Sequence, residues 1–264
     1  MNRMKSYFGF VIMGLMLSSC ASVYSPSIVN APLFSEEGEV QIQLQTGTGG
    51  TGLQGAFAID YNLGFIGNFN YLERNNIDGD KLKHAIGELG FGYFVPQGHD
   101  FKFEIFGGYG YGFGSTRFSG NSSLSNNYDL LQGNYHKLFI QADVGIPTDY
   151  FDIGLSFRDA NALYFNGKGV SNGNVTYFKE NASFLESVLF TRFGYKYVKF
   201  TAQMGLSLPL NNAQHISQNY YAFMFNIGVY VAIRDSFKKE KSPPELPPIA
   251  PVPPKEPPPE PGKP

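Results

Sequence analysis

The sequence predicts an all-β fold: an up-and-down antiparallel transmembrane β-barrel of about ten strands, with eight or twelve strands as the alternatives. Apolar and polar residues alternate with a period of two over most of residues 39–237, as they do in strands with two different faces. The connections between the expected strands are long at one end of the array and short at the other. Charged residues make up only 16% of the chain, below the roughly 25% of an ordinary soluble domain.

The composition is typical of strands that lie between lipid and a polar interior. Of the 264 residues, 25 are Phe, 17 are Tyr and 31 are Gly. A helical membrane protein needs runs of about 20 apolar residues, whereas alternating strands need only every second residue to be apolar. The formal net charge of −2 offers no attraction for nucleic acid, which we do not expect as a partner. An aromatic-rich soluble β-sandwich is the alternative that composition leaves open.

Residues 1–19 are predicted to be a signal peptide. Arg3 and Lys5 precede an apolar run over residues 7–17 that is too short to span a membrane. The end of this segment, Leu17-Ser18-Ser19-Cys20, resembles the bacterial lipobox. The resemblance implies cleavage before Cys20 and attachment of acyl chains such as palmitate to that residue, and several chains anchor more firmly than one. An ordinary signal peptide with an accidental cysteine is the alternative.

The anchored chain is expected in the cell outer membrane, with non-globular flanks on both sides of the barrel. Ala21 follows the cysteine in place of the Asp that retains lipoproteins at the inner membrane of enteric bacteria. Residues 20–38 are predicted to be an extended, lipid-anchored tether. Residues 238–264 are Pro-rich and alternate Pro with Lys and Glu, so we expect a disordered or polyproline II tail in the periplasm.

Ten strands are expected within residues 39–237, and most reach the roughly 9–11 residues that a tilted strand needs to cross a membrane. The alternation is clearest in residues 101–115, where Phe101, Phe103 and Ile105 oppose Lys102 and Glu104. The expected strands are 39–47, 53–61, 64–72, 84–95, 101–115, 135–146, 151–158, 184–195, 198–208 and 220–233.

The connections favour a membrane barrel over a sandwich. Outer-membrane barrels have short periplasmic turns and longer extracellular loops, and an even number of strands returns both ends of the array to one side. We therefore expect both termini in the periplasm. The longer connections are 48–52, 73–83, 116–134, 159–183 and 209–219, and the shorter ones are 62–63, 96–100, 147–150 and 196–197.

The last expected strand carries a candidate assembly signal. Asn226, Gly228, Val231 and Ile233 follow the order polar, any, Gly, any two, hydrophobic, any, hydrophobic. This pattern resembles the signal by which the barrel-assembly machinery recognises its clients, so that machinery is an expected partner during biogenesis. Membrane lipid and protein partners in the outer membrane or periplasm are the other expected partners.

A ten-stranded barrel encloses only a narrow lumen. Because unpaired buried charges are costly, we expect inward-facing charges of both signs to pair and fill it; a selective small pore is the alternative. The glycines from Gly108 to Gly114 on one strand are interpreted as room for bulky neighbours such as Phe139 or Arg158, or as a means of bending the strand. The expected inward charges are Asp60, Glu88, Lys102, Glu104, Lys137, Asp143, Arg158, Glu186, Arg192 and Lys199.

The sequence offers little catalytic chemistry, and we expect a non-enzymatic protein with no cofactor and no metal. Asp78 and Asp80, with His84 and His215, are the nearest match to an omptin-type hydrolase at the barrel rim. The connection 159–183 contains no histidine, so the two aspartates are better interpreted as part of a polar turn. Two carboxylates also fall short of the 6–8 oxygens that Ca²⁺ takes.

The segment from Cys20 to Gln41 resembles the opening of outer-membrane barrel lipoproteins common in Bacteroidota, through Asn30-Ala-Pro-Leu33 and Glu37-Gly-Glu39 after the cysteine. The stretches Leu53–Ala58 and Asn62–Gly64 also fit. The resemblance implies a lipid-anchored barrel but no activity. In that phylum, lipoproteins sent to the surface usually carry acidic residues just after the cysteine. Residues 21–24 lack them, which implies an anchor in the periplasmic leaflet.

The leading hypothesis is a structural or accessory subunit of an envelope complex, such as an outer-membrane assembly or secretion machine. A barrel already held in the membrane does not need acyl chains unless its N-terminus has to be located. The alternative is a surface-binding barrel that recognises external ligands through loops 116–134 and 159–183, which are rich in Asn, Ser, Gly and Tyr. The omptin-type hydrolase is a third and weaker hypothesis.

Overall fold

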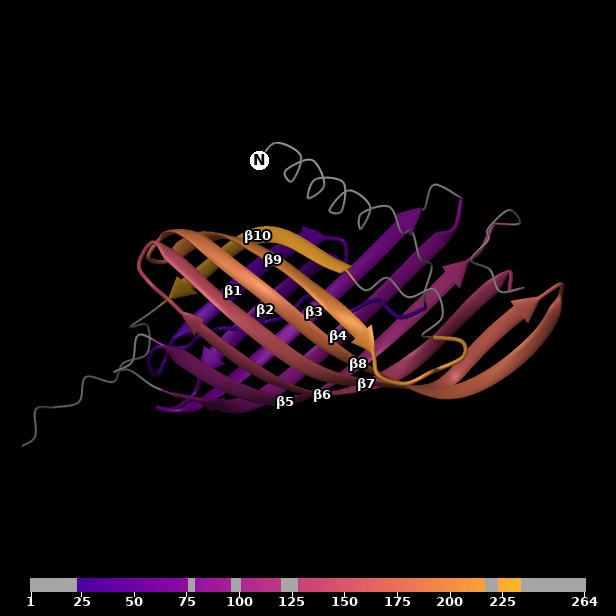
Figure 1. Ribbon diagram of the computed structural model, residues 1–264, viewed down its shortest axis with the longest axis horizontal. Helices are drawn as coiled ribbons and strands as arrows, with labels where there is room; N and C mark the ends of the chain where they lie inside the picture. The colour runs from indigo at the N-terminus through magenta and orange to yellow at the C-terminus, as the bar shows by residue number, and fades with distance from the viewer. Residues whose placement is uncertain (1–22, 76–78, 96–100, 120–127, 217–222, 234–264) are drawn as a thin grey trace, which may run out of the picture.

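The computed structural model is a closed barrel of ten antiparallel strands, and it describes residues 23–75, 79–95, 101–119, 128–216 and 223–233 (Figure 1). Each strand pairs with its neighbours in the chain, and the barrel closes between β1 and β10. The predicted ten-stranded up-and-down barrel is thereby confirmed, and the counts of eight and twelve are excluded. The strands are β1 (Val40–Gly47), β2 (Gly50–Ala58), β3 (Leu63–Asn75), β4 (Lys81–Phe94), β5 (Lys102–Arg117), β6 (Leu130–Ile146), β7 (Phe151–Ser171), β8 (Asn174–Tyr195), β9 (Val198–Pro209) and β10 (Phe223–Ile233).

The two ends of the barrel differ in the lengths of their connections, and the two longest, 118–129 and 210–222, lie at the same end. The end at the left of Figure 1, where β10 ends, carries the connections 59–62, 95–101, 147–150 and 196–197, and we call it the turn end. The opposite end carries 48–49, 76–80, 118–129, 172–173 and 210–222, and we call it the loop end. β1 begins and β10 ends at the turn end, since Val40 lies opposite Ile233.

The outer wall is apolar, and aromatic side chains gather near both ends. In β5, Phe103, Ile105 and Tyr109 point outward and are nearly half exposed, whereas Lys102 and Glu104 between them are buried. Among the described residues, no helix is long and apolar enough to cross a membrane. Exposed aromatic residues near the turn end include Tyr61, Tyr93, Tyr150, Tyr195 and Tyr197, and those nearer the loop end include Tyr71, Tyr111, Phe113 and Phe165.

The prediction of a loop over residues 159–183 is wrong, because β7 and β8 run on and pair almost to their common turn. Asn172 and Gly173 form that turn with φ angles of 49° and 79°. Positive φ at both central residues is the requirement of a type I′ hairpin turn, for which Asn-Gly is the preferred pair. β8 therefore continues beyond its pairing with β9, which stops at Phe184 opposite Pro209. β7 stays paired with β6 as far as Val170, and the hairpin extends past the rest of the loop end (Figure 1).

The prediction of a non-globular N-terminal flank is also wrong for its described part. Residues 23–38 run inside the barrel, seen as the indigo trace between the strands in Figure 1. Val23 lies at the loop end beside Gly114 of β5, and Gly38 lies at the turn end, where its N–H donates to the Ala58 carbonyl. An even number of strands brings the two ends of the sheet to the same end of the barrel, but that argument leaves out a segment that crosses the lumen without joining the sheet. The described chain therefore starts and finishes at opposite ends of the barrel, and both termini of the protein lie outside the described residues.

Paired glycines in β5 provide a test of the inward packing. A Cβ added at Gly108 would lie 2.2 Å from Phe139 Cζ in the lumen, whereas a Cβ at the outward Gly107 would meet nothing within 4 Å. We expect Gly108→Ala to destabilise the barrel by about 1–3 kcal/mol through overpacking. The measurement is the temperature at which the detergent-solubilised protein loses its compact gel migration. Gly107→Ala is the matched control, and equal shifts for both variants would contradict the described packing.

Candidate functional site: the occupied lumen

Residues 23–38, which we call the plug segment, fill the middle of the barrel. Every residue from Val23 to Phe34 is buried, although none of them belongs to a strand. A strand on a surface buries every second residue, so burial of twelve successive residues means that the wall surrounds this segment on all sides.

The wall supplies hydrogen bonds that a sheet would otherwise supply to the plug segment. Each of the five carbonyls from Ile28 to Pro32 accepts a hydrogen bond from an inward side chain of the wall. An unpaired buried carbonyl costs about 1–3 kcal/mol, so these side chains fix the path of the segment. The donors are Gln54 to Ile28 (2.8 Å), Gln203 to Val29 (2.9 Å), Gln141 to Asn30 (2.7 Å), and Arg192 to Ala31 and to Pro32 (3.3 Å).

A carboxylate near the turn end binds two successive backbone N–H groups of the plug segment. Glu104 of β5 accepts hydrogen bonds from Leu33 N at 2.9 Å and from Phe34 N at 2.6 Å. Leu33 has a φ of 57°, a left-handed conformation that is uncommon for residues other than Gly, Asn and Asp. This conformation turns both N–H groups toward one anion, as in a backbone nest.

At mid-height, four buried charges meet around one serine hydroxyl. Lys137 Nζ lies 2.9 Å from Glu88, and Arg158 lies 3.6 Å from Glu88 and 3.7 Å from Glu186. Ser27 Oγ donates to Glu88 at 2.9 Å and accepts from Lys137 at 3.0 Å and from Arg158 at 3.1 Å. The cluster holds two acids and two bases from β4, β6, β7 and β8 and is neutral as a whole.

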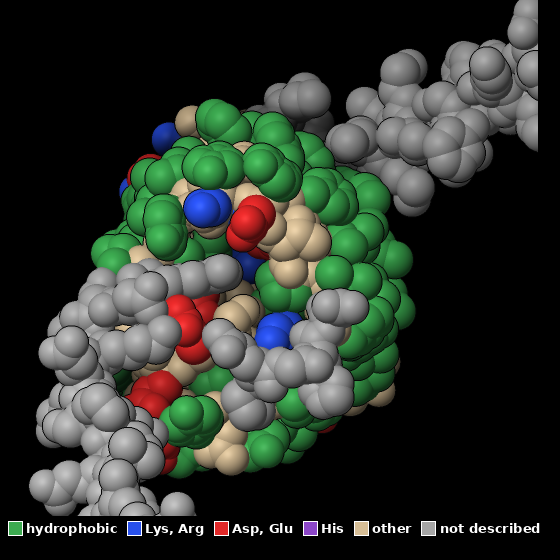
Figure 2. Space-filling model, turned by 90° about the vertical axis from the view of Figure 1, so that its left-hand side faces the viewer, with side chains coloured by type: hydrophobic (Ala, Val, Ile, Leu, Met, Phe, Trp, Pro, Cys, Tyr) green, Lys and Arg blue, Asp and Glu red, His purple; other side chains and the backbone are tan. Residues whose placement is uncertain are grey.

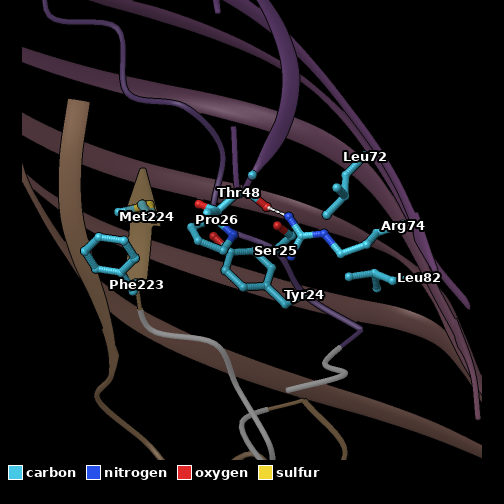
Figure 3. A pocket seen from close by; sticks show the side chains of 10 residues that line it. Tyr24, Ser25, Pro26, Thr48, Leu72, Arg74, Leu82, Phe223 and Met224 are labelled. Carbon is cyan, nitrogen blue, oxygen red and sulfur yellow. Dashed lines mark hydrogen bonds between the residues drawn. The ribbon is translucent and has the colours of Figure 1, made fainter. Parts of the chain in front are cut away.

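Near the loop end the plug segment packs through an aromatic side chain. The Tyr24 ring stacks on Phe184 with centroids 4.3 Å apart, and the Tyr24 hydroxyl donates to Glu186 at 3.0 Å. Beside it, a cavity of about 30 Å³ lies between the plug segment and the wall, bordered by Arg74, whose guanidinium donates to the Thr48 carbonyl (Figure 3). That volume holds about one water molecule.

The glycines of β5 provide room for bulky neighbours, as the sequence indicated. A Cβ at Gly112 would lie 2.4 Å from the Tyr135 ring, and one at Gly114 would lie 2.0 Å from the Val23 carbonyl oxygen. The predicted neighbour Phe139 is confirmed at Gly108. The inward glycines of β5 therefore make room both for aromatic side chains of the wall and for the plug segment. The sequence did not predict that the plug segment would lie there.

The inward charges are confirmed with one exception. Asp60 is exposed in the β2–β3 turn, where its carboxylate accepts the Tyr61 N–H. The view onto the turn end shows acidic and basic side chains inside a ring of hydrophobic ones (Figure 2). The nine buried residues are Glu88, Lys102, Glu104, Lys137, Asp143, Arg158, Glu186, Arg192 and Lys199.

The residues considered for an omptin-type site have separate structural partners. Asp80 is buried and accepts the Ser119 N–H at 2.7 Å, a bond that joins the start of β4 to the residues that follow β5. His84 faces the lumen and lies 2.6 Å from the Tyr135 hydroxyl. His215 pairs with Glu180 and stacks on Phe178. Asp78 lies outside the described residues.

No group of three or more His, Cys, Asp or Glu side chains that could hold a metal ion occurs within the residues that the structure describes. The residues of the candidate assembly signal lie in β10. Asn226 is buried toward the lumen and Ile233 points outward, while Gly228 backs closely against Leu44 and Gln45 of β1. Cys20 lies outside the described residues.

The outer wall has a hollow, which we call the glycine groove, of about 560 Å³. Gly55 of β2, Gly67 of β3 and Gly87 of β4 form its floor, where the wall has no side chains. Apolar and aromatic residues border it, among them Leu53, Phe69, Leu89, Tyr109 and Tyr111. Nothing lies within 4 Å of a Cβ built at Gly55 or at Gly87, so the floor is open to the outside. Sequence periodicity does not reveal such a groove, because glycine fits either face of a strand.

Breaking the charge cluster should cost far more stability than breaking a surface ion pair. In Glu88→Gln, Lys137 and Arg158 lose a buried partner, and we expect a loss of about 3–5 kcal/mol. The matched control is Glu73→Gln, which removes an exposed pair with Lys83 at 2.8 Å and should change little. Urea unfolding of protein reconstituted in detergent micelles measures both, and comparable losses would contradict the role given to the cluster.

No family model and no curated protein matches the chain. Among solved structures, it is similar to the translocator domain of the autotransporter NalP from Neisseria meningitidis, with a TM-score of 0.43 and 11% sequence identity. The match covers 73% of this chain and 86% of that chain. This similarity is too low to carry an activity from one protein to the other.

Proposed function

We propose that this protein is a non-enzymatic outer-membrane barrel, lipid-anchored at Cys20, that serves as an accessory subunit of an envelope complex. The observation that carries the proposal is the occupied lumen. A barrel whose interior is filled by a hydrogen-bonded segment and a neutral charge cluster is not built as an open pore. Its working surfaces are then its outer wall and its two ends.

The outer wall supports a membrane location. Residues that face outward on every strand include large apolar side chains, such as Leu44 at 55% and Ile140 at 64% exposure. Contiguous exposed apolar surface of this extent would be a severe liability in water. Between two aromatic girdles it matches a hydrocarbon layer.

The glycine groove supports a partner within the membrane. A wall covered evenly by side chains presents lipid with a convex surface, whereas this groove lets a helix or strand approach the backbone of β2, β3 and β4. Close backbone approach through small residues is a recurrent mode of association in membranes.

A closed lumen predicts that the barrel does not conduct ions. The wild-type protein in planar lipid bilayers should show no steady ion conductance. A variant that lacks residues 23–36, and so loses the contacts of Ser27 with Glu88 and Lys137, should admit small ions. Open-channel currents from the intact protein would contradict the proposal.

The partner surface can be tested by co-purification from solubilised membranes. We expect the double variant Gly55→Leu and Gly87→Leu to fill the glycine groove without backbone clash and to lose the bound partners. Ala202→Leu, on the outward face of β9, is the matched control and should retain them. Deletion of residues 238–264 tests the tail separately. Purification of the wild type as a monomer free of other proteins would refute the accessory role.

A second candidate, recognition of external ligands at the loop end, is favoured by the extended β7–β8 hairpin. Val175 and Tyr177 on this hairpin are 48% and 77% exposed. Tyrosine side chains on a rigid hairpin give contact area at low entropic cost. Shortening the hairpin should abolish ligand or cell binding under this function and leave co-purified membrane partners unchanged.

A further inference from the structure

We propose that the plug segment carries the N-terminus across the membrane, so that the acyl chains on Cys20 insert in the leaflet at the loop end. This inference rests on the proposed function in two respects: the barrel spans the outer membrane with its turn end in the periplasm, and Cys20 is acylated. It reverses the expectation of a periplasmic-leaflet anchor.

The contacts of the plug segment fix its direction. At the turn end, Phe34 N donates to Glu104, and Glu104 lies opposite Phe94 near the end of β4. At mid-height, Ser27 joins the charge cluster of Glu88 and Arg158. At the loop end, the Val23 carbonyl accepts from the Tyr164 hydroxyl at 3.4 Å. The segment thus makes one complete passage from loop end to turn end before β1 returns.

Val23 has already reached the outer boundary of the apolar wall. It lies against Gly114 of β5, and the outward residues around this level change from Phe113 to Ser115 and Arg117. On the neighbouring β4, Lys83 lies opposite Ser115 and pairs with Glu73 of β3. Charged side chains that face outward at this height lie beyond hydrocarbon.

Chain length prevents Cys20 from returning to the other leaflet. Val23 is three Cα–Cα steps from it along the chain, and even a fully extended chain covers only about 3.6 Å per step, roughly 11 Å in total. The apolar band of such barrels is about 25 Å tall. A second passage through the lumen is blocked, since the described interior is already occupied and the cavity beside Tyr24 measures only about 30 Å³.

Three epitope insertions in the full-length protein test the topology. One peptide epitope is placed between Ser22 and Val23, one in the β7–β8 turn after Asn172, and one in the β8–β9 turn after Lys196. Antibody binding is compared between intact and permeabilised cells, and blots of denatured protein confirm that each epitope is present. The turn insertions are the loop-end and turn-end references.

The expected result is that the epitope after Ser22 is bound on intact cells, like the one after Asn172, whereas the epitope after Lys196 is bound only after permeabilisation. Binding at Ser22 that appears only after permeabilisation, with the two references still opposed, would overturn the inference alone. References that do not differ would instead refute the membrane-spanning orientation, and with it the proposed function. A Cys20 peptide without acyl mass in mass spectrometry would remove the anchor and leave the path of the chain standing.

Discussion

The structure depends on one buried hydroxyl that holds two acids and two bases in a single neutral cluster. Each ion loses several kcal/mol of hydration on burial, and Glu88, Lys137, Arg158 and Glu186 recover it only together. Ser27, which belongs to the plug segment, lies among them and forms hydrogen bonds with three of the four charged side chains. Wall and plug segment are therefore one folded unit, and the folded domain begins at or before Val23 rather than at residue 39.

The same reasoning explains why the inward face is polar without being a water channel. A peptide that enters a barrel brings carbonyl and N–H groups that no strand can pair, and buried backbone groups are nearly always paired. Gln54, Gln141 and Gln203 meet this need for the carbonyls, because the Nε2 group of each amide side chain donates to one of them. Glu104 does the same for the two N–H groups that follow Pro32. The wall thus binds the main chain of the plug segment through hydrogen bonds, as a peptide-binding protein binds its ligand.

The sequence predicted the structure correctly where successive residues alternate between the two faces of a strand. The period-two pattern predicted ten strands, the outward apolar set and nine of the ten inward charges. It failed for Val23–Phe34, because a segment that is buried on every side has no alternation. The available signals were a stretch of twelve residues without charge, with two prolines, facing a wall rich in inward glutamine. It also missed the Asn172-Gly173 turn, whose two residues carry a specific turn signal within a stretch that looked like a loop.

The enclosed path of the plug segment also constrains the order of assembly. A segment held by side chains from β2, β5, β6, β8 and β9 cannot readily be drawn through a ring that has already closed. The wall has to wrap around it, and the seam between β1 and β10 is the one junction that joins strands distant in the chain. That seam is then the last to close, and β10, whose Gly228 packs against β1, is the last strand to join the barrel.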